Sequence, residues 1–167
     1  MLDPQRRVSF LHLLAIGGLA ALAAPEATAQ TVVPTYNAVD AETLMNIIRN
    51  QGQAQITADG SDPLGPILKV QGAGGLNYSV YMDDCDGGQP SLCKSLEFRA
   101  TLPAGAINFA QLNDFNQTMR YATAYFDKGV PMLRMDQSVR GGVTADFLAY
   151  DVRIFIKVVA SFVQKAK

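Results

Sequence analysis

Apolar residues near the C-terminus form a single stripe, and this stripe constrains the fold more than any other feature. Leu148, Val152, Phe155, Val159 and Phe162 follow one another at steps of 4, 3, 4 and 3 residues. This spacing places all five side chains on one face of an α-helix, which we expect to cover Thr144 to Lys165. Such a helix must bury its apolar face against another layer of secondary structure.

Alternation of apolar and polar residues predicts that the other layer is a β-sheet. Residues 76–82 and 96–102 alternate with the period of a half-buried strand. Asp127-Lys128-Gly129 is a hairpin turn between two further strands. The predicted strands are residues 54–58, 67–71, 76–82, 96–102, 119–126 and 131–135, and the pattern leaves open whether 67–71 extends or replaces the first of them.

Two shorter helices complete the predicted architecture. Asp40 is placed to cap a helix over Ala41–Gln51, and Asn108 with Gln111 forms a capping box that opens a helix over Phe109–Gln117. The resulting order is α-β-β-β-α-β-β-α. We therefore expect an α+β fold in which helices flank an antiparallel five-stranded sheet.

The first 29 residues have the features of an export signal. Arg6 and Arg7 precede an apolar run from Phe10 to Ala24, and Ala27-Thr28-Ala29 resembles a cleavage site. We expect a signal peptide over residues 1–29, an extended lead-in over 30–38 and a folded domain over 39–167. The mature chain would be periplasmic or secreted. A retained anchor stays as an alternative, as do both general secretory and twin-arginine export.

Cleavage would also limit the chemistry of the mature chain, because it would remove His12, the only histidine. A serine or cysteine nucleophile would then have no histidine base, so we predict that the protein is not an enzyme. The 14 basic and 15 acidic residues form no basic region for nucleic acid. No segment after the signal is suited to a membrane. We predict no cofactor and no metal.

Two cysteines flank a loop rich in glycine and proline between two predicted strands. Cys85 and Cys93 are eight residues apart, and in an exported protein this arrangement favours a disulfide that closes the loop. A catalytic pair would more often have the spacing C-x-x-C at the start of a helix. A zinc site would need further ligands, and the mature chain would have no histidine to supply them.

An acidic sequence before Gly87 raises one alternative function. Asp83, Asp84 and Asp86 could form a calcium loop, but the first and twelfth positions of that loop would be Met82 and Cys93. A calcium loop of this type needs acidic ligands at both ends. We therefore keep calcium or small-molecule binding here only as the alternative to the main hypothesis.

Other polar side chains are expected to have structural or contact roles. Asn113 and Asn116 lie three residues apart near the end of the second helix, where their amides could bond backbone groups at the turn into the next strand. The odd spacing of Tyr78 and Tyr81 places them on opposite faces of a strand. Tyr121 and Tyr125 are also expected to lie on sheet faces. Some of the four tyrosines should therefore be exposed and able to contact a peptide.

The second half of the chain also contains a series of short motifs. They are the run from Gln111 to Asn116, then Arg120-Tyr121-Ala122, Asp127-Lys128-Gly129, Met135-Asp136 and Gly141-Gly142-Val143 before the last helix. Together they resemble the YbjN family of small bacterial sensory-transduction regulators, over about Val39 to Val163. Phe115 stands where the family more often has tryptophan. The resemblance implies a fold like that of type III secretion chaperones.

These observations lead to one functional hypothesis. We expect a non-enzymatic, exported domain that binds a protein or regulates one, with chaperone-like architecture, in the bacterial cell envelope. The expected partner is another polypeptide, and homodimerisation is left open. Nucleic acid is excluded as a partner, as is a membrane after signal cleavage. No ligand-binding residues can be named from the sequence.

Overall fold

A computed structural model of the chain describes residues 33–52, 55–59, 64–72, 75–88 and 90–166. All of them fall in the unit Val33–Lys167. The predicted signal peptide with its cleavage site and the first part of the predicted lead-in lie outside the described residues. The predictions about export therefore stay predictions.

An antiparallel sheet of six strands forms one layer of the fold. Every neighbouring pair in it is antiparallel, and the crossover through the helical layer from β5 to β6 leaves room between these two strands for β7. In spatial order the strands are β2 (Gln55–Asp59), β3 (Ile67–Gln71), β4 (Asn77–Cys85), β5 (Cys93–Thr101), β7 (Val130–Ser138) and β6 (Thr123–Asp127).

The predicted count of five strands is wrong, because residues 55–59 and 67–71 form two strands rather than one. They pair with each other as β2 and β3, with Gln55 opposite Gln71 and Asp59 opposite Ile67. The strand predicted from Met119 begins only at Thr123, since Met119 caps the preceding helix. Two short strands, β1 (Thr35–Tyr36) and β8 (Val143–Thr144), form a separate small sheet.

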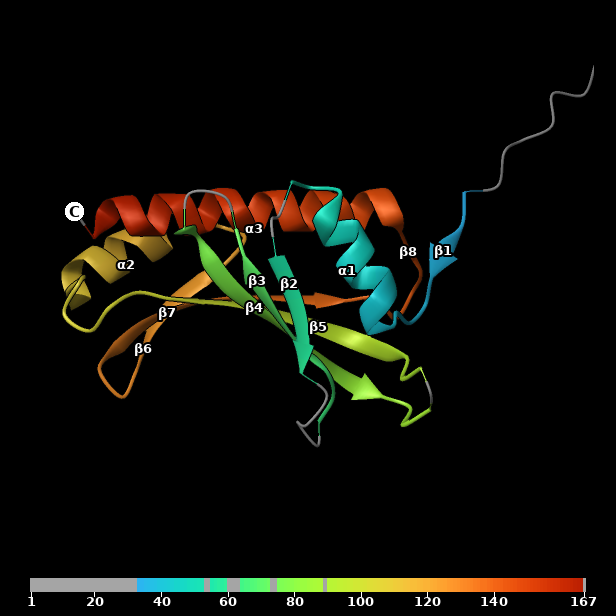
Figure 1. Ribbon diagram of the computed structural model, residues 1–167. Helices are drawn as coiled ribbons and strands as arrows, with labels where there is room; N and C mark the ends of the chain where they lie inside the picture. Colours follow the sequence, from blue (N-terminus) through green and yellow to red (C-terminus); the bar gives the residue numbers. More distant parts are fainter. Residues whose placement is uncertain (1–32, 53–54, 60–63, 73–74, 89, 167) are drawn as a thin grey trace, which may run out of the picture. The chain divides into compact units, whose positions relative to one another are not determined.

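Three helices lie on the same side of the six-stranded sheet (Figure 1). Helix α3 (Ala145–Lys165) runs along the sheet, with α1 (Ala41–Arg49) and α2 (Phe109–Thr118) packed against it. The predicted caps form, since Asp40 accepts from the Thr43 amide, and Asn108 and Gln111 make the reciprocal bonds of a capping box. No helix among the described residues has the length and apolar character to cross a membrane.

The core lies between α3 and the inner face of the sheet. The predicted stripe of α3 is buried, and its central residue Phe155 contacts Tyr78 and Phe98 with ring centroids 5.5 and 5.4 Å apart. Near the C-terminal end of α3, Phe162 packs on Phe115 of α2. The inner residues of the sheet are therefore covered, whereas its outer residues have no helix over them (Figure 1).

Asp151 is a half-buried acid on α3, and it makes stability depend on pH. Burial raises its pKa to about 6 from 3.8, and its Oδ2 atom is buried without a hydrogen-bond partner. The folded chain therefore holds a proton at a pH where the unfolded chain has lost it. Stability should fall as the pH rises between these two pKa values.

Replacing Asp151 by asparagine should remove this pH dependence and stabilise the protein at pH 7 by about 1 kcal/mol. This gain is well below the free energy that corresponds to the full pKa shift, because solvent screens a half-exposed group. Urea unfolding between pH 4 and 7 measures the slope for both proteins. Asp146→Asn is a control that should lower the free energy of unfolding instead of raising it. Asp146 lies in the first turn of α3, where its negative charge interacts favourably with the helix dipole. An unchanged slope in D151N would contradict the assignment.

Candidate functional site

The outer face of the sheet, here called the open face, carries polar, charged and aromatic side chains. It consists of the alternate residues of each strand that point away from the helices. Their cross-strand register places Tyr81 opposite Glu97, and Glu97 opposite Asp136. The neighbouring row contains Lys69, Ser79, Arg99, Arg134 and Thr123.

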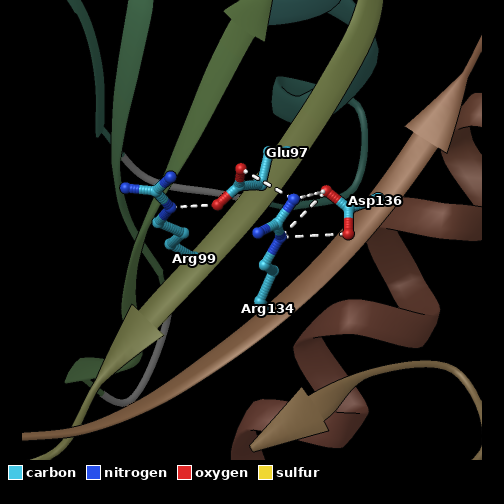
Figure 2. Close-up of polar contacts among 4 residues, drawn as sticks. All are labelled: Glu97, Arg99, Arg134 and Asp136. Atoms are coloured by element: carbon cyan, nitrogen blue, oxygen red, sulfur yellow. Dashed lines mark hydrogen bonds and ion pairs between the residues drawn. The ribbon is translucent and has the colours of Figure 1, made fainter. Parts of the chain in front are cut away.

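A group of four charged residues lies at the centre of the open face (Figure 2). This group, the Glu97 cluster, consists of Glu97 and Arg99 on β5 and Arg134 and Asp136 on β7. Arg99 Nε donates to Glu97 Oε1, and Arg134 Nη2 lies 3.4 Å from Glu97 Oε2. Arg134 also donates to both oxygens of Asp136 at 2.8–3.0 Å. The four side chains therefore form one continuous chain of ion pairs.

Glu97 is the unusual member of this cluster because it is buried. It is 6% exposed, and it is the only charged residue among the buried residues that the structure describes. Removing a carboxylate from water is costly unless ion pairs and hydrogen bonds replace the water. The two arginines supply this compensation, so Glu97 fixes the positions of both guanidinium groups.

Arg99 is held by a second contact as well. Its guanidinium lies over the ring of Tyr81, 4.2 Å from the ring centroid, in a cation–π contact. The hydrogen bond to Glu97 raises the pKa of Arg99 above its already high value, so this residue stays charged. Arg99 is therefore an oriented positive charge on the surface.

Three shallow hollows surround the cluster. One of about 290 Å³ lies over β3, β4 and β5 and includes Lys69 and Arg99. Another of about 400 Å³, on the other side of Tyr81, includes Asp83, Asp84 and Glu97. The third, of about 430 Å³, is lined by Thr123, Tyr125, Arg134 and Asp136. The open face therefore has hollows into which side chains of a ligand could fit, and these hollows are lined by different charges.

The outer edge of β6 is closed by a side chain. Asn116 of α2 donates from Nδ2 to the Ala124 carbonyl and accepts from the Ala124 amide, both at 2.8 Å. In an antiparallel pair, the backbone groups of successive residues point alternately toward the partner strand and away from it. Asp127 pairs with Val130 beside the hairpin turn, so its backbone groups point toward β7. Ala124 lies three residues earlier, so its backbone groups point away from β7. The predicted role of Asn116 at this turn is confirmed, whereas Asn113 is exposed and takes no part.

Replacing Asn116 by alanine should lower the free energy of unfolding by about 1–2 kcal/mol, since it removes two hydrogen bonds from a partly buried backbone position. Asn113→Ala, one turn away on the same helix, should change it by less than about 0.5 kcal/mol. Urea unfolding of both variants measures the difference. Equal effects in the two variants would show that the Asn116 amide adds nothing to stability.

Cys85 and Cys93 lie directly opposite each other where β4 and β5 meet the loop between them. Their sulfur atoms are at disulfide distance, 2.04 Å apart, and the structure contains no free cysteine among its described residues. Gly65 packs against this pair with φ of +152°, and a Cβ at Gly65 would lie 1.9 Å from the Met82 carbonyl oxygen. Only glycine fits this close approach.

The purified protein should therefore contain no titratable thiol unless it is first reduced. Replacing both Cys85 and Cys93 by serine should lower the free energy of unfolding by about 2–3 kcal/mol, the value expected for closing a loop of this length. Thiol titration with and without denaturant, followed by urea unfolding, tests both statements. Two free thiols in unreduced protein would contradict them.

The acidic residues of the alternative calcium site are engaged elsewhere. Asp84 pairs with Arg140 at 2.5 Å, and Asp86 Oδ1 accepts from the amides of Gly88 and Leu92 at 3.0 Å. These two bonds lower the pKa of Asp86. Asp83 points to the open face, and no group of three possible metal ligands forms within the described part of the chain. The three carboxylates thus do not converge, and the calcium alternative is not supported.

The tyrosines divide between the core and the surface, as their spacing predicts. Tyr78 is buried, and burial raises its pKa well above the ordinary value, whereas Tyr81 is partly exposed on the opposite face. Tyr125 joins Tyr81 on the open face. The expectation that Tyr121 lies on a sheet face is wrong, because Tyr121 precedes β6 and lines a small hollow beside α3.

Sequence reasoning did not identify the Glu97 cluster. The only visible signal is the pair of opposite charges two residues apart, Glu97 with Arg99 and Arg134 with Asp136, each on one face of a strand. The contact that joins the two pairs depends on the register of β5 against β7, which the sequence does not show. Polar residues at alternate strand positions by themselves predict only a solvent-facing side of the sheet.

Comparison with known proteins supports the family resemblance. The chain matches the family model YbjN, described as "Putative bacterial sensory transduction regulator", over residues 40–166. No curated protein matches the chain. The family model covers nearly all of the described fold, including the Glu97 cluster, the Asn116 contact and helix α3. The chain therefore belongs to the YbjN family.

Proposed function

We propose that this protein is a non-enzymatic regulatory domain that is exported to the bacterial cell envelope and binds another polypeptide through the open face of its sheet. The observation that carries the proposal is the Glu97 cluster, in which a buried carboxylate holds two arginines in place on a face that no helix covers. The description of the family as a sensory-transduction regulator is consistent with it.

The composition of the open face favours a protein partner. Tyrosine and arginine are the side chains most enriched at the energetically important positions of protein interfaces. Here Arg99 lies on Tyr81, and Arg134 lines a hollow with Tyr125. Because these side chains are already ordered, they would lose less conformational entropy when a partner binds them. The chaperone-like character implied by the family resemblance belongs to this proposal, since such a protein acts by holding a polypeptide.

Photo-crosslinking in the native bacterium tests the binding face. A benzophenone side chain at position 125 of the full-length chain should give one discrete protein adduct, and the same partner should be recovered from position 81. The same group at position 150 is a matched control, because Tyr150 is an exposed tyrosine on α3 in the other layer. Adducts from position 150 alone, or none from positions 81 and 125, would refute the proposed face.

Export is tested separately. Residues 1–30 fused to a periplasmic reporter should deliver it across the inner membrane, and N-terminal sequencing of the exported chain should find cleavage near Ala29. A mature chain that still begins before Phe10 would favour the retained anchor. A reporter that remains in the cytoplasm would reject export.

A further inference from the structure

The hollow over β3, β4 and β5, here called the cationic hollow, has a distinct charge. Its volume is about 290 Å³, and Lys69 and Arg99 line it together with neutral polar side chains such as Ser79, Asn77 and Gln71. No aspartate or glutamate is among its lining residues. The acidic residues of this region line the next hollow, beyond the Tyr81–Arg99 stack. Both charged groups that line the cationic hollow are therefore positive, and each also pairs with a carboxylate outside the hollow, Lys69 with Asp59 and Arg99 with Glu97.

Arg99 lines this hollow and has donors left over for a ligand. Its Nε atom is bonded to Glu97 and its plane is held over Tyr81, whereas its terminal nitrogens have no hydrogen-bond partner among the described residues. Figure 2 shows one of these nitrogens pointing away from Glu97. A planar guanidinium matches the two oxygens of a carboxylate, and here it is fixed before the ligand arrives.

Lys69 supplies a second positive charge on the same row of the sheet. Lys69 pairs with Ser79 on β4, and Ser79 pairs with Arg99 on β5. Since neighbouring strands lie about 4.8 Å apart, the two basic residues flank a position above Ser79. The pair of Lys69 with Asp59 is exposed and 3.4 Å long, so Lys69 can exchange it for a ligand at little cost.

We propose that the cationic hollow binds a glutamate or aspartate side chain of an acidic partner polypeptide, with Arg99 as the oriented contact and Lys69 as the second cation. This inference rests on the proposed function and names the chemistry of its partner. A polypeptide fits better than a small free anion. Both cations are partly exposed, with side chains 34% and 61% accessible, so a lone carboxylate would gain little there. A polypeptide adds contacts along the open face.

Fluorescence anisotropy with labelled peptides tests this inference on the full mature protein. A ten-residue peptide of alternating glutamate and serine should bind at least ten times more tightly than its glutamine–serine counterpart at low salt. Raising the salt to 0.5 M should abolish most of the difference, because exposed charges are screened. Equal binding of the two peptides would overturn the proposal.

Variants locate the site. Lys69→Gln and Arg99→Gln should each weaken binding of the glutamate peptide at least fivefold, and Arg99→Lys should also weaken it because lysine lacks the planar fork. Lys157→Gln on α3 is the matched control, since it makes the same change in net charge at an exposed position in the other layer. Equal weakening by K157Q would show that only net charge matters and would reject the site.

Thermal melts of each variant separate loss of binding from loss of folding. If R99Q is unstable, the peptide affinity of K69Q alone tests the site. The two proposals also fail separately. Crosslinks from position 125 without any preference for acidic peptides would reject the carboxylate site and leave the binding face intact. Peptide binding without crosslinks from positions 81 and 125 would reject the proposed function.

Discussion

Replacing Phe155 by alanine is expected to lower the free energy of unfolding by about 4 kcal/mol, the largest effect of any single change considered. Phe155 is completely buried, and its ring contacts both Tyr78 and Phe98 between α3 and the sheet. Removing the ring loses its transfer free energy and leaves a cavity that the two neighbouring strands cannot fill. Urea unfolding followed by circular dichroism measures the change.

Phe147→Ala provides the matched control for this prediction. Phe147 is the same residue type on the same helix, but it is 43% exposed. Its replacement should cost less than about 1 kcal/mol, because much of its surface already contacts water. Similar losses in the two variants would mean that α3 does not pack on the sheet through its predicted stripe.

Replacing Glu97 by glutamine should lower the free energy of unfolding by about 2 kcal/mol. The change removes the negative charge between Arg99 and Arg134 and turns an amide N–H₂ group toward one of them. Breaking a buried ion pair can cost about 3–5 kcal/mol. The expected value here is smaller because the two arginine side chains are 34% and 45% exposed and can regain water.

Asp136→Asn is the control for Glu97, since it also removes one negative charge from the cluster. The Asp136 side chain is 59% exposed and pairs with Arg134 alone, so its replacement should cost less than about 1 kcal/mol. Unfolding in urea at low and high salt compares the two. A Glu97→Gln variant as stable as the parent would show that the cluster is not needed for folding.

The helices could be predicted well because their signals are local. The capping interactions of Asp40 and of Asn108 with Gln111 lie within one turn, and both occur in the structure. The stripe of α3 is equally local, since its period belongs to the helix itself. The hairpin turn at Lys128-Gly129 also forms, with positive φ at both residues, as a tight turn of this type requires.

The number of strands depended on non-local information. Residues 67–71 alternate between buried and exposed positions, but residues 55–59 are mostly exposed and bury no residue fully. They are two strands because they pair with each other. The stabilisation from this pairing cannot be recognised from the sequence of either segment alone. The separate sheet of β1 and β8 was missed for the same reason, because it joins residues far apart in the chain.

The candidate site was predictable only in part. The spacing of Tyr78 and Tyr81 correctly placed one ring inside and one on the open face. By contrast, the burial of Glu97 arises from Arg99 on its own strand and Arg134 on the next, which are brought together by strand register. A single glutamate in an alternating strand carries no sign that two arginines will enclose it.

The contact between Asn116 and Ala124 determines how far sheets of different molecules can join. A polymer of sheets joined head to tail needs two free edges on every molecule, so that each β2 meets the β6 of the next. In this fold the Asn116 amide already occupies the backbone groups of Ala124 on the β6 edge. Pairing through β6 would first have to break these two hydrogen bonds, which favours pairing through β2. Two molecules that paired β2 with β2 would form a closed, two-fold unit that has no second β2 edge from which to grow.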